Sequence, residues 1–316
     1  MRLTLFDFSN THVFHRKALL SAINYINSKC PPSQSITVVV GTRNIIRVLP
    51  EYLLSEGKFI LIFTGFGRLF TNYGFAGRLL FNLVIRSLSR KRILGFIVEN
   101  SDDALYLQRI SNIKVYETYG SGLNSSGFYF RKKITSQKLN IGYLSRFDKS
   151  KGSTEILKIA EELPDHCQLY IAGWDISSNK FGSLFSKIAS EKSNVHYFKK
   201  LNSRKEVSDF FNSIDVFLCP SLREGGCISI QESVWHHVPF VTTNVPGCQQ
   251  LADRFECPAY DMKYFAEEVL KNLSVFKELG TRGWKNKLSC YTVDSVRGEF
   301  IKILEDITAE LRSKKR

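Results

Sequence analysis

Short apolar runs alternate with helical patterns along this chain, and that alternation constrains the fold more than any other feature. In the first 110 residues the apolar runs are 3–8, 36–41, 59–65 and 93–100. Helical patterns lie between and after them, near 13–28, 75–90 and 102–110. A chain that alternates in this way builds βα units, with parallel strands covered by helices. The sequence therefore predicts an α/β fold.

A second series of the same kind follows a polar, glycine-containing stretch at 119–138. Its apolar runs are 139–145, 167–174, 195–198, 215–220 and 239–243. We predict a basic α/β domain over 1–138, a second α/β domain over 139–295, and a C-terminal helix over 296–316. Two doubly wound domains would bind ligands where the carboxyl ends of their strands face a cleft.

Positive charge is concentrated in the first domain. Residues 1–140 hold 19 lysines and arginines against seven acidic residues, so +12 of the net charge of +14 lies there. This charge favours an anionic partner, which could be membrane lipid, a lipid diphosphate or nucleic acid. No helix-turn-helix, RNP-like or zinc-finger pattern occurs, which argues against nucleic acid.

The stretch 66–92 combines apolar residues at helical spacing with arginines. One interpretation is a helix that packs one face on the sheet and leaves its basic face in water. The other is an interfacial helix on anionic lipid. No apolar run reaches the roughly 18 residues that span a bilayer, and the N-terminus does not resemble a signal peptide. We expect a cytoplasmic protein.

The seven cysteines indicate neither a metal site nor a disulfide. They form no CxxC pair, and Cys167 and Cys219 lie in apolar runs. We expect reduced thiols in the core.

A basic loop follows the first apolar run of the second series. In "YLSRFDKSKG" (143–152), Arg146 and Lys151 precede Gly152, which opens a helical pattern. Two cations beside a helix N-terminus suit a diphosphate group, because the cations, the free N–H groups and the helix dipole all favour negative charge. The alternative is a basic loop that is only solvated.

Two glutamates frame the segment "SLREGGCISIQES" (221–233). Glu224 stands at the end of an apolar run, before Gly225 and Gly226, and Glu232 lies in the helix that follows. Glycines let backbone N–H groups approach a ligand closely, so both carboxylates could face one site. Alternatively, Glu224 is a helix N-terminal anion and Glu232 a surface residue.

Together these motifs resemble the retaining glycosyltransferases of family 4, which have the GT-B fold of two Rossmann-like domains with a cleft between them. "SRFDKSKG", "LYIAGW", "DVFLCPSLREGGCISIQES" and "VPFVTTNVPGCQQL" occur in the order that the family has. The resemblance covers the C-terminal half. It implies that 1–138 is a shortened Rossmann-like domain that binds the acceptor, that 139–295 is a Rossmann-like domain that binds the nucleotide sugar, and that the helix over 296–316 could pack back on the first domain. It implies transfer from a nucleotide sugar, UDP-linked by expectation, without a metal or other cofactor. The absence of an Asp-x-Asp motif agrees with that.

The resemblance also assigns residue roles. Arg146 and Lys151 would hold the diphosphate, Glu224 would contact the sugar, and Glu232 would accept hydrogen bonds from the ribose hydroxyls. The implied catalytic residues are Glu224, Arg146 and Lys151. The implied donor-binding residues are Arg146, Lys151, Glu224, Gly225, Gly226, Cys227 and Glu232.

The N-terminal half resembles, more loosely, bacterial members that extend glycans on undecaprenyl diphosphate. The segments are "TGFGRLFTNYG" (64–74), "VENSDD" (98–103) and "GSGLN" (120–124). They imply a lipid-diphosphate-linked acceptor, a role in O-antigen or capsule synthesis, and a peripheral location on the inner face of the plasma membrane. The implied acceptor-side residues are Thr64, Gly65, Gly67, Asn100, Gly122 and His12.

Several positions depart from the family pattern. "SNTHVFH" (9–15) replaces the usual glycine-rich loop, and Lys199 and His237 stand where glycines are common. His237 could end its helix in the left-handed conformation, which histidine tolerates better than most residues. His12 and His15 could orient or deprotonate the acceptor, or be structural, as could His196.

The sequence therefore predicts a glycosyltransferase of EC class 2.4 that moves a hexose or N-acetylhexosamine. Its partners would be a nucleotide sugar, a lipid-diphosphate-linked acceptor and an anionic membrane surface. One alternative is an inactive GT-B scaffold or partner subunit, which the complete set of Arg146, Lys151, Glu224 and Glu232 disfavours. A basic nucleic-acid-binding protein is the weaker alternative.

Overall fold

The chain folds into two compact units, each built on its own parallel sheet. A computed structural model describes residues 2–6, 17–29, 35–41, 44–45, 47, 50, 52, 56–88, 92–130, 137–175, 180–279, 281 and 284–313, without the side chains of 67–73 and 310–313. Unit 1 comprises residues 1–124 and 289–316, and unit 2 comprises 125–288. The predicted α/β fold is confirmed.

Unit 1 contains a five-stranded parallel sheet in the order β1-β2-β3-β4-β5. Its strands are β1 (Arg2–Phe6), β2 (Ser35–Val40), β3 (Lys58–Phe63), β4 (Ile93–Val98) and β5 (Val115–Glu117). Its main helices are α1 (Lys17–Lys29), α3 (Gly67–Ser87), α4 (Ser101–Ile110) and α13 (Val293–Ser313).

Both faces of this sheet are buried, which explains its apolar strands. Alternate residues of a strand point to opposite faces. Accordingly, Ile60 and Ile62 of β3 join the cluster that contains α1, whereas Phe59, Leu61 and Phe63 join the cluster that contains α3 and α4.

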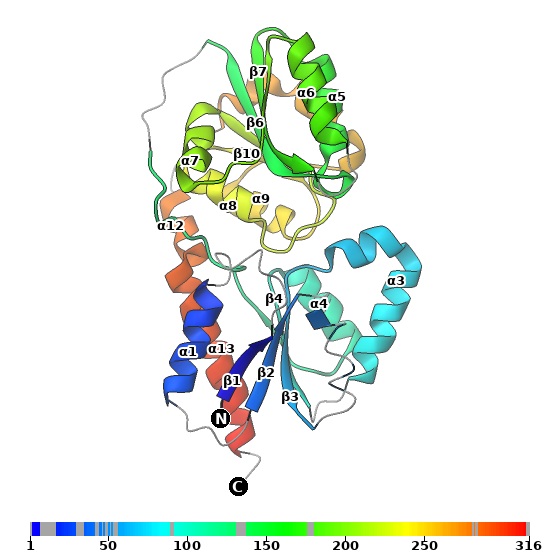
Figure 1. The fold of residues 1–316 in the computed structure, drawn as a ribbon, viewed down its shortest axis with the longest axis vertical. Coiled ribbons are helices and arrows are strands. Elements are labelled where there is room, and N and C mark those ends of the chain that lie inside the picture. Colours follow the sequence, from blue (N-terminus) through cyan, green and yellow to red (C-terminus); the bar gives the residue numbers. More distant parts are fainter. Residues whose placement is uncertain are drawn as a thin grey trace. The chain divides into compact units, whose positions relative to one another are not determined.

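The C-terminal helix α13 packs in unit 1, beside α1 (Figure 1). It buries Val296, Phe300, Leu304 and Ile307, whose spacing of three or four residues forms one apolar stripe. At its exposed side, Asp306 accepts hydrogen bonds from Lys114, at 2.6 Å, and Tyr116, at 2.8 Å. The chain therefore enters unit 2 and returns to complete unit 1.

The crossing points differ from the predicted boundaries at 138 and 295. The first unit ends at residue 124, because Leu123 donates its N–H to the carbonyl of Tyr291 (2.6 Å). The segment that follows packs on unit 2: Phe130 stacks on Trp235 with ring centroids 4.4 Å apart, and Tyr129 hydrogen-bonds Asp209. This part of the polar stretch is therefore a packed strap.

Unit 2 contains a six-stranded parallel sheet in the order β11-β10-β9-β6-β7-β8. Its strands are β6 (Leu139–Phe147), β7 (Cys167–Asp175), β8 (Val195–Phe198), β9 (Val216–Cys219), β10 (Phe240–Thr243) and β11 (Ala259–Tyr260). Its helices are α5 (Ser153–Glu162), α6 (Phe181–Glu191), α7 (Arg204–Ser213), α8 (Ile228–Trp235), α9 (Cys248–Phe255), α10 (Phe265–Lys271), α11 (Leu273–Phe276) and α12 (Trp284–Leu288).

The end of the chain is less uniformly helical than its sequence suggests. Residues 261–313 have a helical pattern in the sequence, but they form several short helices before α13, with breaks near Asn272 and before α12. Within the described part of the chain, no helix is both long and apolar enough to cross a membrane.

Candidate active site

The order of the strands in unit 2 alone indicates where a ligand would bind. The chain runs outward from β6 through β7 to β8, then crosses back to β9 on the other side of β6. Neighbouring loops diverge where a parallel sheet changes direction in this way, and ligands bind at that switch point, outside the carboxyl ends of the strands. The loops after β6 and β9 carry the predicted diphosphate and glutamate motifs.

The loop after β6 is held by its own polar groups. The carboxylate of Asp148 accepts a hydrogen bond from the backbone N–H of Lys151 (3.1 Å), and the Tyr143 hydroxyl donates to the carbonyl of Lys151 (3.0 Å). Gly152 follows in the left-handed conformation, with φ 73°. A Cβ at Gly152 would lie 2.0 Å from the carbonyl oxygen of Pro220, so only glycine allows this loop to lie against the next.

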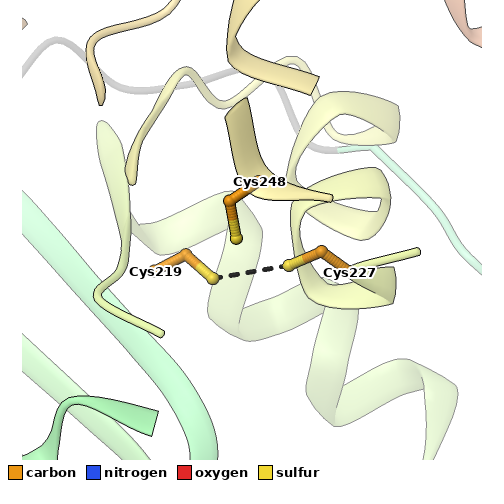
Figure 2. A group of neighbouring side chains, drawn as sticks. All are labelled: Cys219, Cys227 and Cys248. Carbon is orange, nitrogen blue, oxygen red and sulfur yellow. Dashed lines mark hydrogen bonds between the residues drawn. The ribbon is translucent and has the colours of Figure 1, made fainter. Parts of the chain in front are cut away.

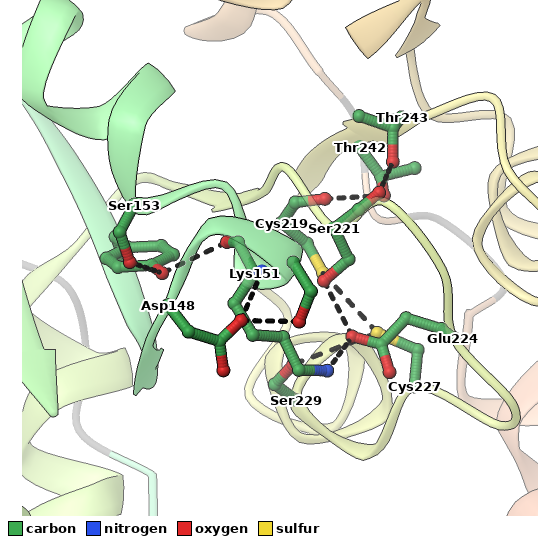
Figure 3. A network of polar contacts seen from close by, with 12 residues as sticks. Asp148, Lys151, Ser153, Cys219, Ser221, Glu224, Cys227, Ser229, Thr242 and Thr243 are labelled. Atoms are coloured by element: carbon green, nitrogen blue, oxygen red, sulfur yellow. Dashed lines mark hydrogen bonds and ion pairs between the residues drawn. The ribbon is translucent and has the colours of Figure 1, made fainter. Parts of the chain in front are cut away.

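The loop after β9 carries Glu224, which is paired with Lys151 (Figure 3). The Ser221 hydroxyl donates to the same carboxylate oxygen, at 2.6 Å. Both charged side chains are mostly buried, with 17% of Lys151 and 14% of Glu224 exposed. Burial is the largest single influence and lowers the Lys151 pKa, but the charge and hydrogen bond of Glu224, together with the charges of Cys227 and Cys219, raise the pKa overall.

A third loop, after β10, touches the Glu224 loop directly. Gly247 has φ 80°, and a Cβ there would lie 2.1 Å from the carbonyl oxygen of Gly225 and 2.8 Å from that of Glu224. Thr243 at the end of β10 also donates a hydrogen bond to the carbonyl of Ser221. Three loops from three adjacent strands therefore position Glu224.

Glu232 lies in α8 and is paired with Arg204 of α7. The guanidinium donates to the Glu232 carboxylate at 2.9 Å, and 12% of the Glu232 side chain is exposed. Burial raises the pKa of Glu232 to about 7, although the charge of Arg204 acts in the opposite direction. The carboxyl group therefore titrates near neutral pH.

Arg146, the second predicted cation, lies at the penultimate position of β6, beside Trp174 of β7 in the sheet register. It is half-buried. Among the residues that the structure describes, its guanidinium forms no ion pair. It therefore remains available to an anion at the carboxyl end of β6.

Cys227 turns its side chain inward. It precedes α8 with φ 37°, a conformation that favours glycine, and its thiol lies 3.4 Å from that of Cys219. Hydrogen bonds from Cys227 and Cys248 hold the pKa of the Cys219 thiol well below its usual range, against the effect of burial. The expectation of reduced cysteines agrees with the six that the structure describes, because none forms a disulfide.

The predicted acceptor-side residues lie in unit 1 and have local structural roles. Thr64 and Gly65 follow β3, and Gly67 begins α3. Asn100 is fully buried and caps α4 by accepting from the N–H of Asp103 (2.9 Å). Gly122 has φ 83°, and a Cβ there would lie 3.0 Å from the Cα of Val293.

The structure describes some of the histidines that the sequence analysis considered. His12 and His15 lie outside the described part of the chain. His237 has φ 54° directly after α8, which confirms its interpretation as a left-handed helix end. His196 contacts the side chain of Gln168 at 2.6 Å. His236 is buried between Ser208 and the carbonyl of Glu232, and burial lowers its pKa to about 4.

Sequence reasoning missed the partners of both glutamates. Ser221 stands three residues before Glu224, a spacing that is a recognisable local signal. Arg204 is 28 residues from Glu232, and the three cysteines are residues 219, 227 and 248. Neither group has a short spacing in the sequence from which its contacts could be predicted.

The C-terminal half of the chain is similar to known glycosyltransferases. Residues 128–275 match the family described as "Glycosyl transferases group 1". CapM of Staphylococcus aureus, a capsular polysaccharide biosynthesis glycosyltransferase, is 28% identical over 192 residues, which are 54% of this chain and 48% of CapM. WaaG of Escherichia coli K12, a lipopolysaccharide glucosyltransferase, is 27% identical over 118 residues, 37% of this chain and 30% of WaaG. The matches thus span about half of CapM and less of WaaG.

Solved structures show the fold. HepE of Anabaena, crystallised with UDP and glucose, superposes with a TM-score of 0.69 over 96% of this chain and 99% of HepE, at 9% sequence identity. The neighbours are GT-B proteins, and both units here are Rossmann-like. The predicted GT-B fold is therefore confirmed.

Proposed function

We propose that the chain is a retaining GT-B glycosyltransferase that moves a hexose or N-acetylhexosamine from a UDP-sugar to a lipid-diphosphate-linked glycan in surface polysaccharide synthesis. The observation that carries this proposal is the Lys151–Glu224 ion pair at the switch point of the unit 2 sheet. The pair lies inside the segment that matches group 1 glycosyl transferases. CapM and WaaG, by their names, act in capsule and lipopolysaccharide synthesis, and HepE binds UDP.

Donor binding would exchange the partners of Lys151. Its ammonium and the Glu224 carboxylate are mostly removed from water, where an unpaired charge is costly. A diphosphate brings more negative charge than a carboxylate and would take over the ammonium, with Arg146 as the second cation. Glu224 would then be released to accept hydrogen bonds from the sugar hydroxyls.

The same logic applies to Glu232. Its carboxylate is held by one guanidinium, so a nucleoside ribose could add two O–H donors to it. The N–H groups of Gly225, Gly226 and Cys227 lie between the two glutamates in sequence and are proposed to line the donor site. In this proposal both ends of the nucleotide sugar meet a carboxylate, and its middle meets cations.

Transfer would need no metal at the reacting atoms, because two cations serve the diphosphate. The acceptor hydroxyl would attack the anomeric carbon on the face from which the nucleotide leaves. The departing phosphate oxygen would take the hydroxyl proton, and Lys151 and Arg146 would stabilise the charge that develops there. Adding or withholding Mg²⁺ or Mn²⁺ should then leave the rate unchanged.

The outer surface of α3 supports the proposed membrane partner. After a kink at Gly74, this helix buries Phe81, Ile85 and Leu88 on one side. The opposite side exposes large apolar residues together with Arg78 and Arg86: Phe75 (82% exposed), Leu79 (50%), Leu80 (61%) and Leu83 (58%). Apolar and cationic side chains on one face suit an anionic bilayer surface. We propose that the protein is peripheral on the inner face of the plasma membrane.

The test is a panel of UDP-, GDP- and dTDP-sugars assayed for transfer to synthetic lipid-diphosphate acceptors. We expect turnover with a UDP-sugar and retained anomeric configuration in the product. Glu224→Gln should lose most of the activity, whereas Glu162→Gln, an exposed glutamate at the end of α5, should not. A wild-type chain that binds none of the nucleotides and transfers no sugar contradicts the proposal and favours an inactive scaffold.

A further inference from the structure

Three cysteines, at the end of one strand and at the starts of two helices, bring their thiols together beside the Glu224 loop. Cys219 ends β9, Cys227 directly precedes α8, and Cys248 is the first residue of α9. Their sulfur atoms all lie within 4.8 Å of one another, and all three residues are buried. Figure 2 shows the three side chains pointing toward one point.

The backbone of Cys227 holds a side chain in a conformation that disfavours one. Its φ of 37° and ψ of 71° lie in the left-handed region, where a glycine would be unstrained. Cys227 and His237 are left-handed in this way at the two ends of α8. A side chain held at a conformational cost, and directed at two other buried thiols, is a stronger observation than a lone buried cysteine.

Two helix N-termini face the cluster, although burial raises the pKa of the Cys227 thiol well above its usual range and the hydrogen bond with Cys219 does the same for Cys248. Cys227 is at the N-terminus of α8 and Cys248 at that of α9, where the helix dipoles place about half a positive charge each. Thiolates next to helix N-termini are stabilised relative to thiols.

We propose that Cys219, Cys227 and Cys248 bind a structural zinc ion. Thiolates select soft and borderline metals, and Zn–S bonds of about 2.3 Å place sulfurs on one ion roughly 3.8 Å apart, within the spread seen here. Water or the Ser221 hydroxyl, 3.8 Å from the sulfur of Cys219, would be the fourth ligand. On binding, the three thiols release three protons to solvent, and no electron is transferred.

Charge balance distinguishes zinc from a monovalent ion. Lys151 and Glu224 neutralise each other. Three thiolates with Zn²⁺ carry one negative charge, which the two helix N-termini of about half a charge each offset. Three thiolates with Cu⁺ would carry two negative charges and leave one uncompensated. The divalent ion is therefore the better fit.

The ion would tie together the end of β9 and the starts of α8 and α9. These are the elements on either side of the Glu224 loop, so zinc would fix the base of that loop without touching the donor. This inference does not rest on the proposed transferase activity. It differs from the expectation of no metal site, which rested on the absence of a typical zinc spacing among residues 219, 227 and 248.

The test measures metal content without any substrate. The full chain, purified under reducing conditions without chelators, should contain about one zinc per molecule by plasma mass spectrometry. Cobalt(II) replacing that zinc should give thiolate-to-cobalt charge-transfer bands. Cys248→Ala should weaken zinc binding at least about tenfold. Cys167→Ala is the matched control, because both cysteines are fully buried but Cys167 lies in the core away from the cluster.

Two outcomes overturn the inference. One is wild-type protein that is reduced and folded but takes up neither zinc nor cobalt. The other is wild-type zinc affinity in both Cys248→Ala and Cys219→Ala. If a variant does not fold, the cobalt spectrum of the wild-type protein still shows whether thiolates bind the metal. Wild-type protein that transfers sugar but takes up neither zinc nor cobalt would contradict this inference alone, whereas zinc-loaded protein that binds no nucleotide would contradict the proposed function alone.

Discussion

Both units contain a parallel sheet, but the order in which the strands are connected differs between the two sheets. In unit 1 the described strands follow one another in chain order, so the sheet has no point at which the connections reverse. In unit 2 the chain reverses at β6, and the loops on either side hold Lys151 and Glu224. The proposed chemistry is thus concentrated where the topology opens the sheet edge, and unit 1 instead contains the proposed membrane surface on α3.

The largest effect should come from removing the cation at the switch point. We expect Lys151→Ala to lower kcat/KM for sugar transfer by about 10²- to 10³-fold, because a charge that stabilises the leaving diphosphate is lost. Lys149→Ala, which removes an exposed lysine two residues earlier, should change it little. Steady-state assays with a UDP-sugar compare them. Equal rates for the two variants would place the diphosphate elsewhere.

Adding one methyl group to a loop glycine should lower the unfolding free energy more in unit 2 than in unit 1. Gly152→Ala adds a Cβ that meets the Pro220 carbonyl in a left-handed residue, so we expect a loss of about 3 kcal/mol in unfolding free energy. Gly41→Ala in unit 1, also at positive φ but with open space around it, should cost about 1 kcal/mol. Denaturant unfolding measures both. Similar losses of unfolding free energy in the two variants would show that the loop after β6 moves to accommodate the added Cβ.

The outer surface of α3 is tested by liposome binding. Leu79→Asn with Leu83→Asn should weaken binding to anionic vesicles about thirtyfold, because each half-exposed leucine contributes roughly 1 kcal/mol. Leu105→Asn on α4 is the control, since Leu105 is equally exposed (51%) on another helix of the unit. Sedimentation with vesicles gives the affinities. Unchanged binding in the double variant would remove α3 from the proposed membrane surface.

The smallest effect concerns the protonation of Glu232. Its pKa of about 7 means that the carboxyl group is mostly neutral at pH 6 and ionised at pH 8. An ionised carboxylate accepts more hydrogen bonds from a ribose, so affinity for a UDP-sugar should rise about tenfold between these values. Calorimetry with the wild type and Glu232→Gln measures the difference. A wild-type affinity that does not change with pH is incompatible with a ribose contact to Glu232.

Local pattern predicted the sheets and the charged residues of the site but not their partners. The period of apolar residues identifies strands because it reflects burial, which each strand experiences separately. The packing of the strap at 125–130 could not be predicted, because its partners, Trp235 and Asp209, are about 80 to 100 residues away. Arg204 and the three cysteines were missed for the same reason. Contacts between distant segments leave no spacing in the sequence.

The return of α13 to unit 1 has a consequence for synthesis on the ribosome. At about 5–20 residues per second, roughly 10 to 40 seconds separate the emergence of β5 from that of the residues that fill the α1 face. Unit 2, whose residues are contiguous, is complete before then. The first sheet to be translated is therefore the last to be finished, and until then its apolar α1 face is a target for chaperones.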